Sequence, residues 1–229
     1  MGLYRDHIGP WLIDRACSSR QLNAERHRAL SAVEGTVVEL GAGSGANLIH
    51  YDADHITDLI AIEPNPALVE RLRPKLADVQ FPARIEVARA EELPVETASI
   101  DTVAVTFTLC SIADIATALS EARRVLKPSG RLVFLEHGKA ESRSAQRVQS
   151  FLAPIWKPIA LGCHLARDPV FELEAAGFAI DKVDTYRLSG APAFAATPKR
   201  NRLPNRRKKA LHALGASALG LAVFEKDEP

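Results

Sequence analysis

The chain has 229 residues, 47% of them hydrophobic and 25% charged, a composition typical of a globular protein with one large domain. Its formal net charge is +1, but seven of its 29 Lys and Arg residues lie between Pro198 and Lys209. The remainder therefore carries 22 basic against 28 acidic residues, a net charge of −6, and is poorly suited to binding nucleic acid.

The cysteines and the N-terminus bear on the cell compartment. Cys17, Cys110 and Cys163 are far apart, and the chain has neither a Cys-x-x-Cys pair nor a His/Cys cluster at zinc-ligand spacing. We therefore expect reduced thiols and no metal site. No apolar run of signal-peptide length opens the chain, and no uncharged apolar segment is long enough to span a bilayer. A cytoplasmic protein is expected, and nothing in the sequence predicts its oligomeric state.

Residues 4–33 are expected to form two helices, the first with an apolar stripe that includes Ile8 and Trp11. Thr36, Val37 and Val38 then predict a buried strand that ends in Glu39. Gly41, Gly43 and Gly45 follow, and glycines at this spacing let the backbone turn tightly and approach a ligand closely. A short helix over residues 46–50 is expected to direct its N-terminal amides at an anionic group there.

The next strand, residues 58–62, ends in Glu63. An acid at the end of the second strand of a βαβ unit can accept both ribose hydroxyls of a nucleoside. The alternative, a solvated Glu at a strand end, is weakened by Pro64-Asn65-Pro66, which fixes a turn and starts a helix over residues 67–76.

The rest of the chain alternates strands with helices, the pattern of a doubly wound parallel sheet. Strands are expected at 84–88, 99–105, 131–135, 178–188 and 220–225, and helices at 114–126, 168–177 and 211–221. The segment 140–166, with several prolines and glycines, predicts little regular structure. Residues 198–209 are expected to be a solvated basic loop.

Several motifs in this order resemble class I S-adenosylmethionine-dependent methyltransferases, and more narrowly the thiol methyltransferase-like proteins. The matching stretches are Gly2–Tyr4, Pro10–Asp14, Glu39–Leu48, Glu63–Pro66, Ala90–Pro94, Leu109–Ile112, Arg124–Gly130, Glu136–Gly138 and Gly162–Asp168. The resemblance implies a single domain over residues 1–229 with a Rossmann-like seven-stranded sheet. In that fold the last strand is antiparallel and lies between the fifth and sixth. Residues 1–34 are expected to form a helical lid.

The same resemblance implies S-adenosyl-L-methionine as the cofactor and a small, partly apolar molecule as the methyl acceptor. The expected cofactor-binding residues are Glu39, Gly41, Ala42, Gly43, Gly45, Asn47, Glu63, Pro64, Ala90, Glu91, Thr108, Leu109 and Cys110. The acceptor pocket is expected to contain Tyr4, His7, Trp11 and Trp156, with His137, His164 and Asp168 as candidate catalytic residues. Asp168 has an equally good interpretation as a helix cap, and Cys110 as a small core residue.

Other interpretations remain open at this point. A thiol acceptor is favoured because a thiol is partly ionised near neutral pH, while a lipid, an amine or a phenol is the alternative. A nucleic-acid methyltransferase could use the basic segment, and a non-catalytic cofactor-binding protein would have a blocked pocket. Arg89 departs from the family pattern, in which an Asp faces the adenine amine.

Overall fold

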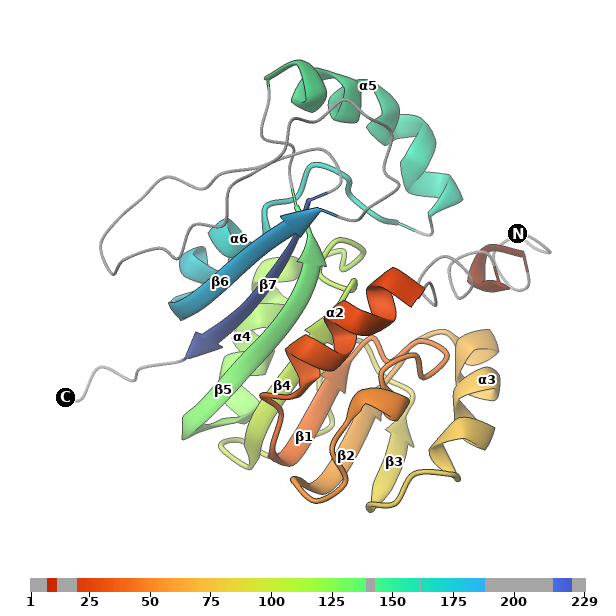
Figure 1. The fold of residues 1–229 in the computed structure, drawn as a ribbon, viewed down its shortest axis with the longest axis vertical. Coiled ribbons are helices and arrows are strands. Elements are labelled where there is room, and N and C mark those ends of the chain that lie inside the picture. The colour runs from red at the N-terminus through yellow and green to blue at the C-terminus, as the bar shows by residue number, and fades with distance from the viewer. Residues whose placement is uncertain (1–7, 12–19, 139–142, 161, 188–215, 224–229) are drawn as a thin grey trace.

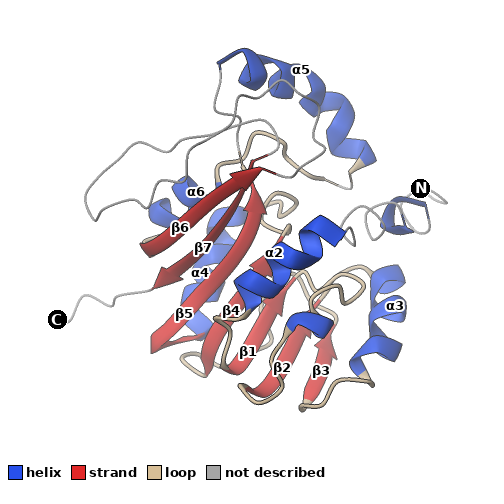
Figure 2. Cartoon of the chain, in the orientation of Figure 1, coloured by secondary structure: helices blue, strands red, loops and turns tan. Residues whose placement is uncertain are grey.

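The structure is a computed structural model that describes residues 8–11, 20–138, 143–160, 162–187 and 216–223. A central sheet has helices on both of its faces (Figure 1, Figure 2). The helices are α2 (Arg20–Leu30), the short 3₁₀ helix η2 (Leu48–His50), α3 (Pro66–Leu76), α4 (Ile115–Val125), α5 (Arg143–Ile159) and α6 (Pro169–Ala175). The strands are β1 (Gly35–Leu40), β2 (Ile56–Ile62), β3 (Ala83–Glu86), β4 (Ile100–Thr106), β5 (Leu126–His137), β6 (Ala179–Arg187) and β7 (Ala216–Val223).

The strands lie in the order β3-β2-β1-β4-β5-β7-β6. The first five pair in parallel, and β7 runs antiparallel to both β5 and β6. This is a Rossmann-like α/β fold, as the sequence predicts. Parallel strands end at the same edge of a sheet, so the residues that follow β1, β2, β4 and β5 meet there.

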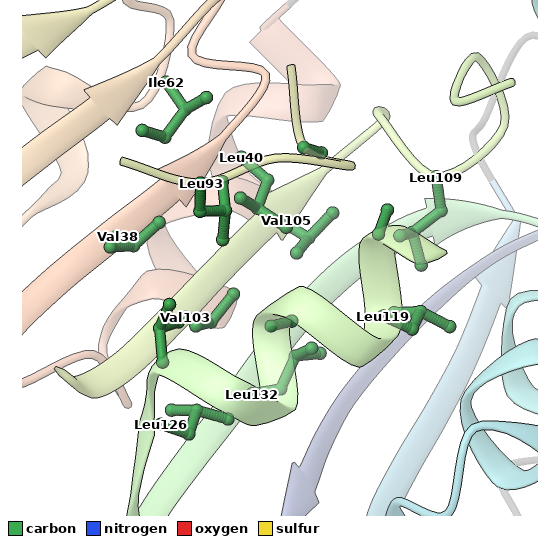
Figure 3. Close-up of a cluster of buried hydrophobic side chains, with 14 of the residues drawn as sticks. Val38, Leu40, Ile62, Leu93, Val103, Val105, Leu109, Leu119, Leu126 and Leu132 are labelled. Carbon is green, nitrogen blue, oxygen red and sulfur yellow. The ribbon is translucent and has the colours of Figure 1, made fainter. Parts of the chain in front are cut away.

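Two hydrophobic cores cover the two faces of the sheet. Successive strand residues point to opposite faces, and accordingly Val38 and Val105 belong to one core while Val37 and Ala104 belong to the other. The first core is closed by the apolar face of α4, as Figure 3 shows, and the second by Ala29 and Leu30 of α2 among others. Burial on both faces explains why these strands read as continuous apolar runs.

Two elements lie where the sequence predicts something else. The segment 140–166 was expected to be irregular, but it contains α5, a helix of 17 residues with Pro154 and Pro158 inside it. Its apolar side chains recur at helical spacing, and this periodicity outweighs the prolines. Residues 211–221 were expected to be helical, with a final strand only at 220–225. The strand is present, but as β7 it already begins at Ala216, because pairing with strands on both sides overrides the helix propensity of an Ala-rich stretch.

Two smaller differences concern boundaries. β5 begins at Leu126 rather than near residue 131, because the buried Leu126 pairs with Ile100 of β4. The helix expected over 46–50 is only η2, since the Asn47 side chain makes no cap hydrogen bond and Tyr51 is extended. The basic segment 198–209 and residues 211–215 lie outside the described residues, as do residues 1–7 and 12–19 of the expected lid.

Candidate active site

The glycine loop after β1 has the backbone conformation that its sequence requires. Gly41, Gly43 and Gly45 all have positive φ angles, +66°, +58° and +81°. A side chain at Gly41 would come within 2.4 Å of the Thr108 side chain. At Gly43, by contrast, a Cβ would meet only the Gly41 carbonyl oxygen, at 3.9 Å. The missing side chain at Gly43 therefore leaves free space that a ligand can occupy.

Glu63, directly after β2, faces this loop. One carboxylate oxygen accepts a hydrogen bond from the Gly43 amide and the other from the Asn65 amide, both at 2.9 Å. The residue is only 5% exposed, and burial raises the pKa of its carboxyl against these two bonds. Each carboxylate oxygen has a second lone-pair site, so Glu63 can hold the loop and still accept a hydrogen bond from a ligand.

A buried polar network lies beneath the loop. Glu39 accepts hydrogen bonds from the Asn47 amide at 2.7 Å and the Tyr51 hydroxyl at 2.9 Å. The Arg26 guanidinium donates to the Asn47 side chain and, at 2.6 Å, to the Thr106 hydroxyl. Burial raises the pKa of Glu39 to about 7, although Tyr51, Arg26 and Asn47 lower it. Glu39 and Asn47 thus anchor the floor of the site to α2 and β4.

The glycine loop and the buried polar network together line a pocket. Its lining residues are Arg26, Glu39, Gly41, Ala42, Gly43, Ser44, Ala46, Asn47, Leu68, Thr106, Phe107 and Thr108. Arg26 is the cationic member of this set, and its guanidinium lies 5.2 Å from the centroid of the Phe107 ring. Phe107 itself has a φ of +52°, a strained backbone conformation of the kind that clusters at functional sites.

Three of the loop amides, which the sequence predicts beside an anionic group, already have hydrogen-bond partners within the protein. The amides of Ala42, Gly43 and Gly45 donate to Ile62, Glu63 and Ala42 respectively, and η2 is too short to direct a helix dipole at a ligand. A negative charge would instead meet Arg26. Sequence reasoning missed Arg26 because it lies on α2, which precedes β1, and no motif marks it.

Seven of the expected cofactor residues lie outside this lining: Gly45, Glu63, Pro64, Ala90, Glu91, Leu109 and Cys110. Pro64 is exposed, and Leu109 is 1% exposed within the core beneath α4. Glu91 accepts hydrogen bonds from Arg89 and from the Asp114 amide, next to the buried Ala90. Their predicted contacts with a nucleoside remain predictions.

The ends of β4 and β5 are tied together by Glu136, which is 1% exposed. One of its carboxylate oxygens accepts hydrogen bonds from the amides of Thr108, at 2.5 Å, and Leu109, at 2.8 Å. Burial raises the pKa of Glu136 to about 7. The sequence motif around Glu136 gave no indication of this supporting role.

The predicted residues Cys110 and His137 come together with Cys163 in one cluster. The His137 Nε2 atom lies 3.2 Å from the Cys163 sulfur, and the three ligand-type atoms lie within 4.8 Å of one another. The hydrogen bond from Cys110 is the largest effect that lowers the pKa of Cys163, and the hydrogen bond and charge of His137 lower it further, against burial. The hydrogen bond between the two thiols raises the pKa of Cys110. Burial lowers the pKa of His137, but Cys163 and Glu136 outweigh it and the net direction is upward.

The remaining candidate catalytic and acceptor-pocket residues do not form one group. The Asp168 carboxylate caps α6 by accepting from the Phe171 amide, the interpretation that the sequence left open. The His164 amide donates to the Cys110 carbonyl at 2.8 Å, and burial, then Arg167 and Lys157, lower the pKa of its imidazole. Trp11 is 50% exposed and Trp156 43% exposed. Tyr4 and His7 lie outside the described residues.

Comparisons with known proteins identify the family and the fold. Residues 38–134 match the family model described as a methyltransferase domain. The thiol S-methyltransferase TMT1B of Rattus norvegicus is 36% identical over 150 residues, 63% of this chain and 60% of the rat protein. Its human counterpart is 32% identical over 174 residues, 70% of each chain. Among solved structures, an S-adenosylmethionine-dependent methyltransferase of Thermotoga maritima superposes with a TM-score of 0.63 at 20% identity, covering 97% of this chain and all of that one.

The chain therefore belongs to the class I S-adenosylmethionine-dependent methyltransferase family. The match spans about three fifths of the rat enzyme's length. No helix in the described part of the chain is long and apolar enough to cross a membrane.

Proposed function

We propose that the protein transfers a methyl group from S-adenosylmethionine to a small, partly apolar thiol. The observation that carries the cofactor assignment is the open space at Gly43, next to the buried carboxylate of Glu63. Bound there, S-adenosylmethionine would supply an electrophilic methyl group on a sulfonium centre. Glu63 would accept hydrogen bonds from the ribose hydroxyls, and Arg26 would pair with the carboxylate of the methionine part.

The thiol is supported by the relatives, which at 32–36% identity are named thiol S-methyltransferases. It also suits the chemistry of the residues present. A free thiol has a pKa near ~8.5 and needs little help from a base. Of the candidate catalytic residues, His164 best fits a proton acceptor, because the lowered pKa of its imidazole favours the neutral form near neutral pH.

The partly apolar character of the acceptor is supported by α5. This helix lies beyond the carboxyl end of β5 (Figure 1), and it presents large apolar side chains that are more than two-fifths exposed. They are Val148, Phe151, Leu152, Ile155, Trp156 and Ile159. A pocket that combines such side chains with a few polar groups suits a modest apolar ligand. We therefore place the acceptor between α5, the segment 162–168 and the N-terminal residues expected to form the lid.

The test is an assay of the full chain with methyl-labelled S-adenosylmethionine and matched acceptors. An alkyl thiol is compared with the alcohol and the amine of the same carbon skeleton, alongside a phenol, and products are identified by mass spectrometry. The proposal expects methyl thioether and little product from the other acceptors. Methylation of the amine or phenol with no transfer to thiols would refute the thiol assignment while leaving the cofactor assignment standing.

A further inference from the structure

We propose that Cys110, His137 and Cys163 form a binding site for a soft divalent cation, with Zn²⁺ as the representative ion. Two sulfur ligands and one imidazole are the donor set that such ions prefer. Within the described residues, these three side chains form the group whose ligand atoms come within 4.8 Å of one another. The inference does not depend on the proposed function, because metal binding can be measured without any methyl acceptor.

The separations between the ligand atoms fit a tetrahedral ion. Zinc–sulfur bonds of about 2.3 Å and zinc–nitrogen bonds of about 2.0 Å place neighbouring ligand atoms roughly 3.5–3.8 Å apart. The His137 Nε2 to Cys163 Sγ distance of 3.2 Å is slightly shorter than this, and the 4.8 Å limit of the cluster is about 1 Å longer. The largest adjustment that tetrahedral geometry requires is therefore about 1 Å.

The three ligands come from separate segments that the backbone holds together. The His164 amide, next to Cys163, donates to the Cys110 carbonyl at 2.8 Å. The Arg167 guanidinium donates to the carbonyl of Ile112 at 2.8 Å and also to that of Leu109. The loop after β4 is thus joined to the segment that carries Cys163. A site that is preformed in this way does not have to order its ligands when the ion binds.

A second set of hydrogen bonds joins the loop that carries Cys110 to β5, which carries His137. Glu136 accepts hydrogen bonds from the Thr108 and Leu109 amides, which fixes the loop that carries Cys110 beside His137. Three protein ligands leave a fourth coordination position for solvent or an exogenous ligand, as in catalytic rather than structural zinc sites. Because Thr108 lines the cofactor pocket and Cys110 follows two residues later, this site would lie close to that pocket.

The experiment uses the full chain, reduced and freed of metal with a chelator, and Co²⁺ as a spectroscopic substitute for Zn²⁺. We expect the cobalt–thiolate charge-transfer band to saturate at one ion per chain and to disappear when Zn²⁺ is added. Cys110→Ser, Cys163→Ser and His137→Gln should each weaken binding by roughly a hundredfold or more, because even residues that only support metal ligands contribute 10–100-fold. Cys17→Ser is the matched control and should retain the band.

A second measurement needs no variant and therefore does not depend on how a variant folds. Zn²⁺ should protect Cys110 and Cys163 of the unmodified protein from alkylation, as read by peptide mass spectrometry, and should leave the reactivity of Cys17 unchanged. The inference is overturned if the reduced protein shows no cobalt–thiolate band and no protection. It is equally overturned if the band depends on Cys17 and survives Cys163→Ser, or if the two clustered cysteines are recovered only as a disulfide that excludes metal.

Discussion

Glu39 makes the stability of the protein depend on pH, and Glu39→Gln tests this. The Gln side chain keeps the shape and can still hydrogen-bond to Asn47 and Tyr51, but it cannot ionise. Burial raises the pKa of Glu39 from 4.5 to about 7 in the folded protein. The folded state therefore retains a proton that the unfolded chain loses near pH 4.5, so the stabilisation is fully present below that pH. It is lost as the pH rises through about 7.

The magnitude follows from the two pKa values. At about 1.4 kcal/mol for each pH unit, the total change is roughly 3 kcal/mol, of which about 2 kcal/mol falls between about pH 5 and pH 7.5. Urea unfolding of both proteins at these two pH values measures it. We expect the free energy of unfolding to fall by about 2 kcal/mol more in the unmodified protein than in Glu39→Gln, while contributions from other groups, Glu136 among them, cancel. Parallel pH profiles would refute the reasoning and would mean that Arg26 keeps Glu39 ionised in the folded state.

The other predictions concern the cofactor. Glu63→Ala should weaken S-adenosylmethionine binding at least tenfold in calorimetric titration, because a hydrogen bond to a charged group contributes roughly 1.5–3 kcal/mol; unchanged affinity would remove Glu63 from the site. Gly43→Ala should weaken binding about tenfold or more, since its methyl group enters the free space beside Glu63 and its φ of +58° strains an alanine, with circular dichroism as the check on folding; full affinity would place the cofactor elsewhere. Arg26→Met should bind S-adenosylmethionine and its decarboxylated analogue equally, whereas the unmodified protein should prefer the former; a preference that persists in the variant would contradict the pairing.

The order of the central elements could be predicted because their signals are local. The apolar runs that form β1, β2 and β4 are buried on both sides, and Asn65 and Asp114 cap the helices that follow. Secondary-structure propensity gave wrong predictions where tertiary contacts determine the structure. β7 is Ala-rich, yet it forms a strand because β5 and β6 offer hydrogen bonds on both sides. In α5, Pro154 and Pro158 argued against a helix, although the apolar residues recur at helical spacing.

Some features of the candidate site could likewise be predicted from local signals, and others could not. The placement of Gly43 beside Glu63 could be predicted because a backbone turn and a strand end fix the two residues within one βαβ unit. Arg26 could not be identified, because a buried cation on a preceding helix leaves no periodic or motif signal. The Cys163 stretch was noted only for its resemblance to the family. Its meeting with Cys110 and His137 depends on the crossover through α4 and on the return of the chain through α5. Sequence spacing therefore led to the expectation that there is no metal site.

Glu136 connects the two parts of the site. Burial disfavours the ionised form of a carboxylate, and it raises the pKa of Glu136 accordingly. This carboxylate holds the amides of Thr108 and Leu109, so that Thr108 lies against the glycine loop while Cys110 lies beside His137. A single side chain thereby fixes both the wall of the proposed cofactor pocket and one ligand of the proposed metal site. Because both contacts are made to this one carboxylate, replacing Glu136 should affect the proposed cofactor pocket and the proposed metal site together.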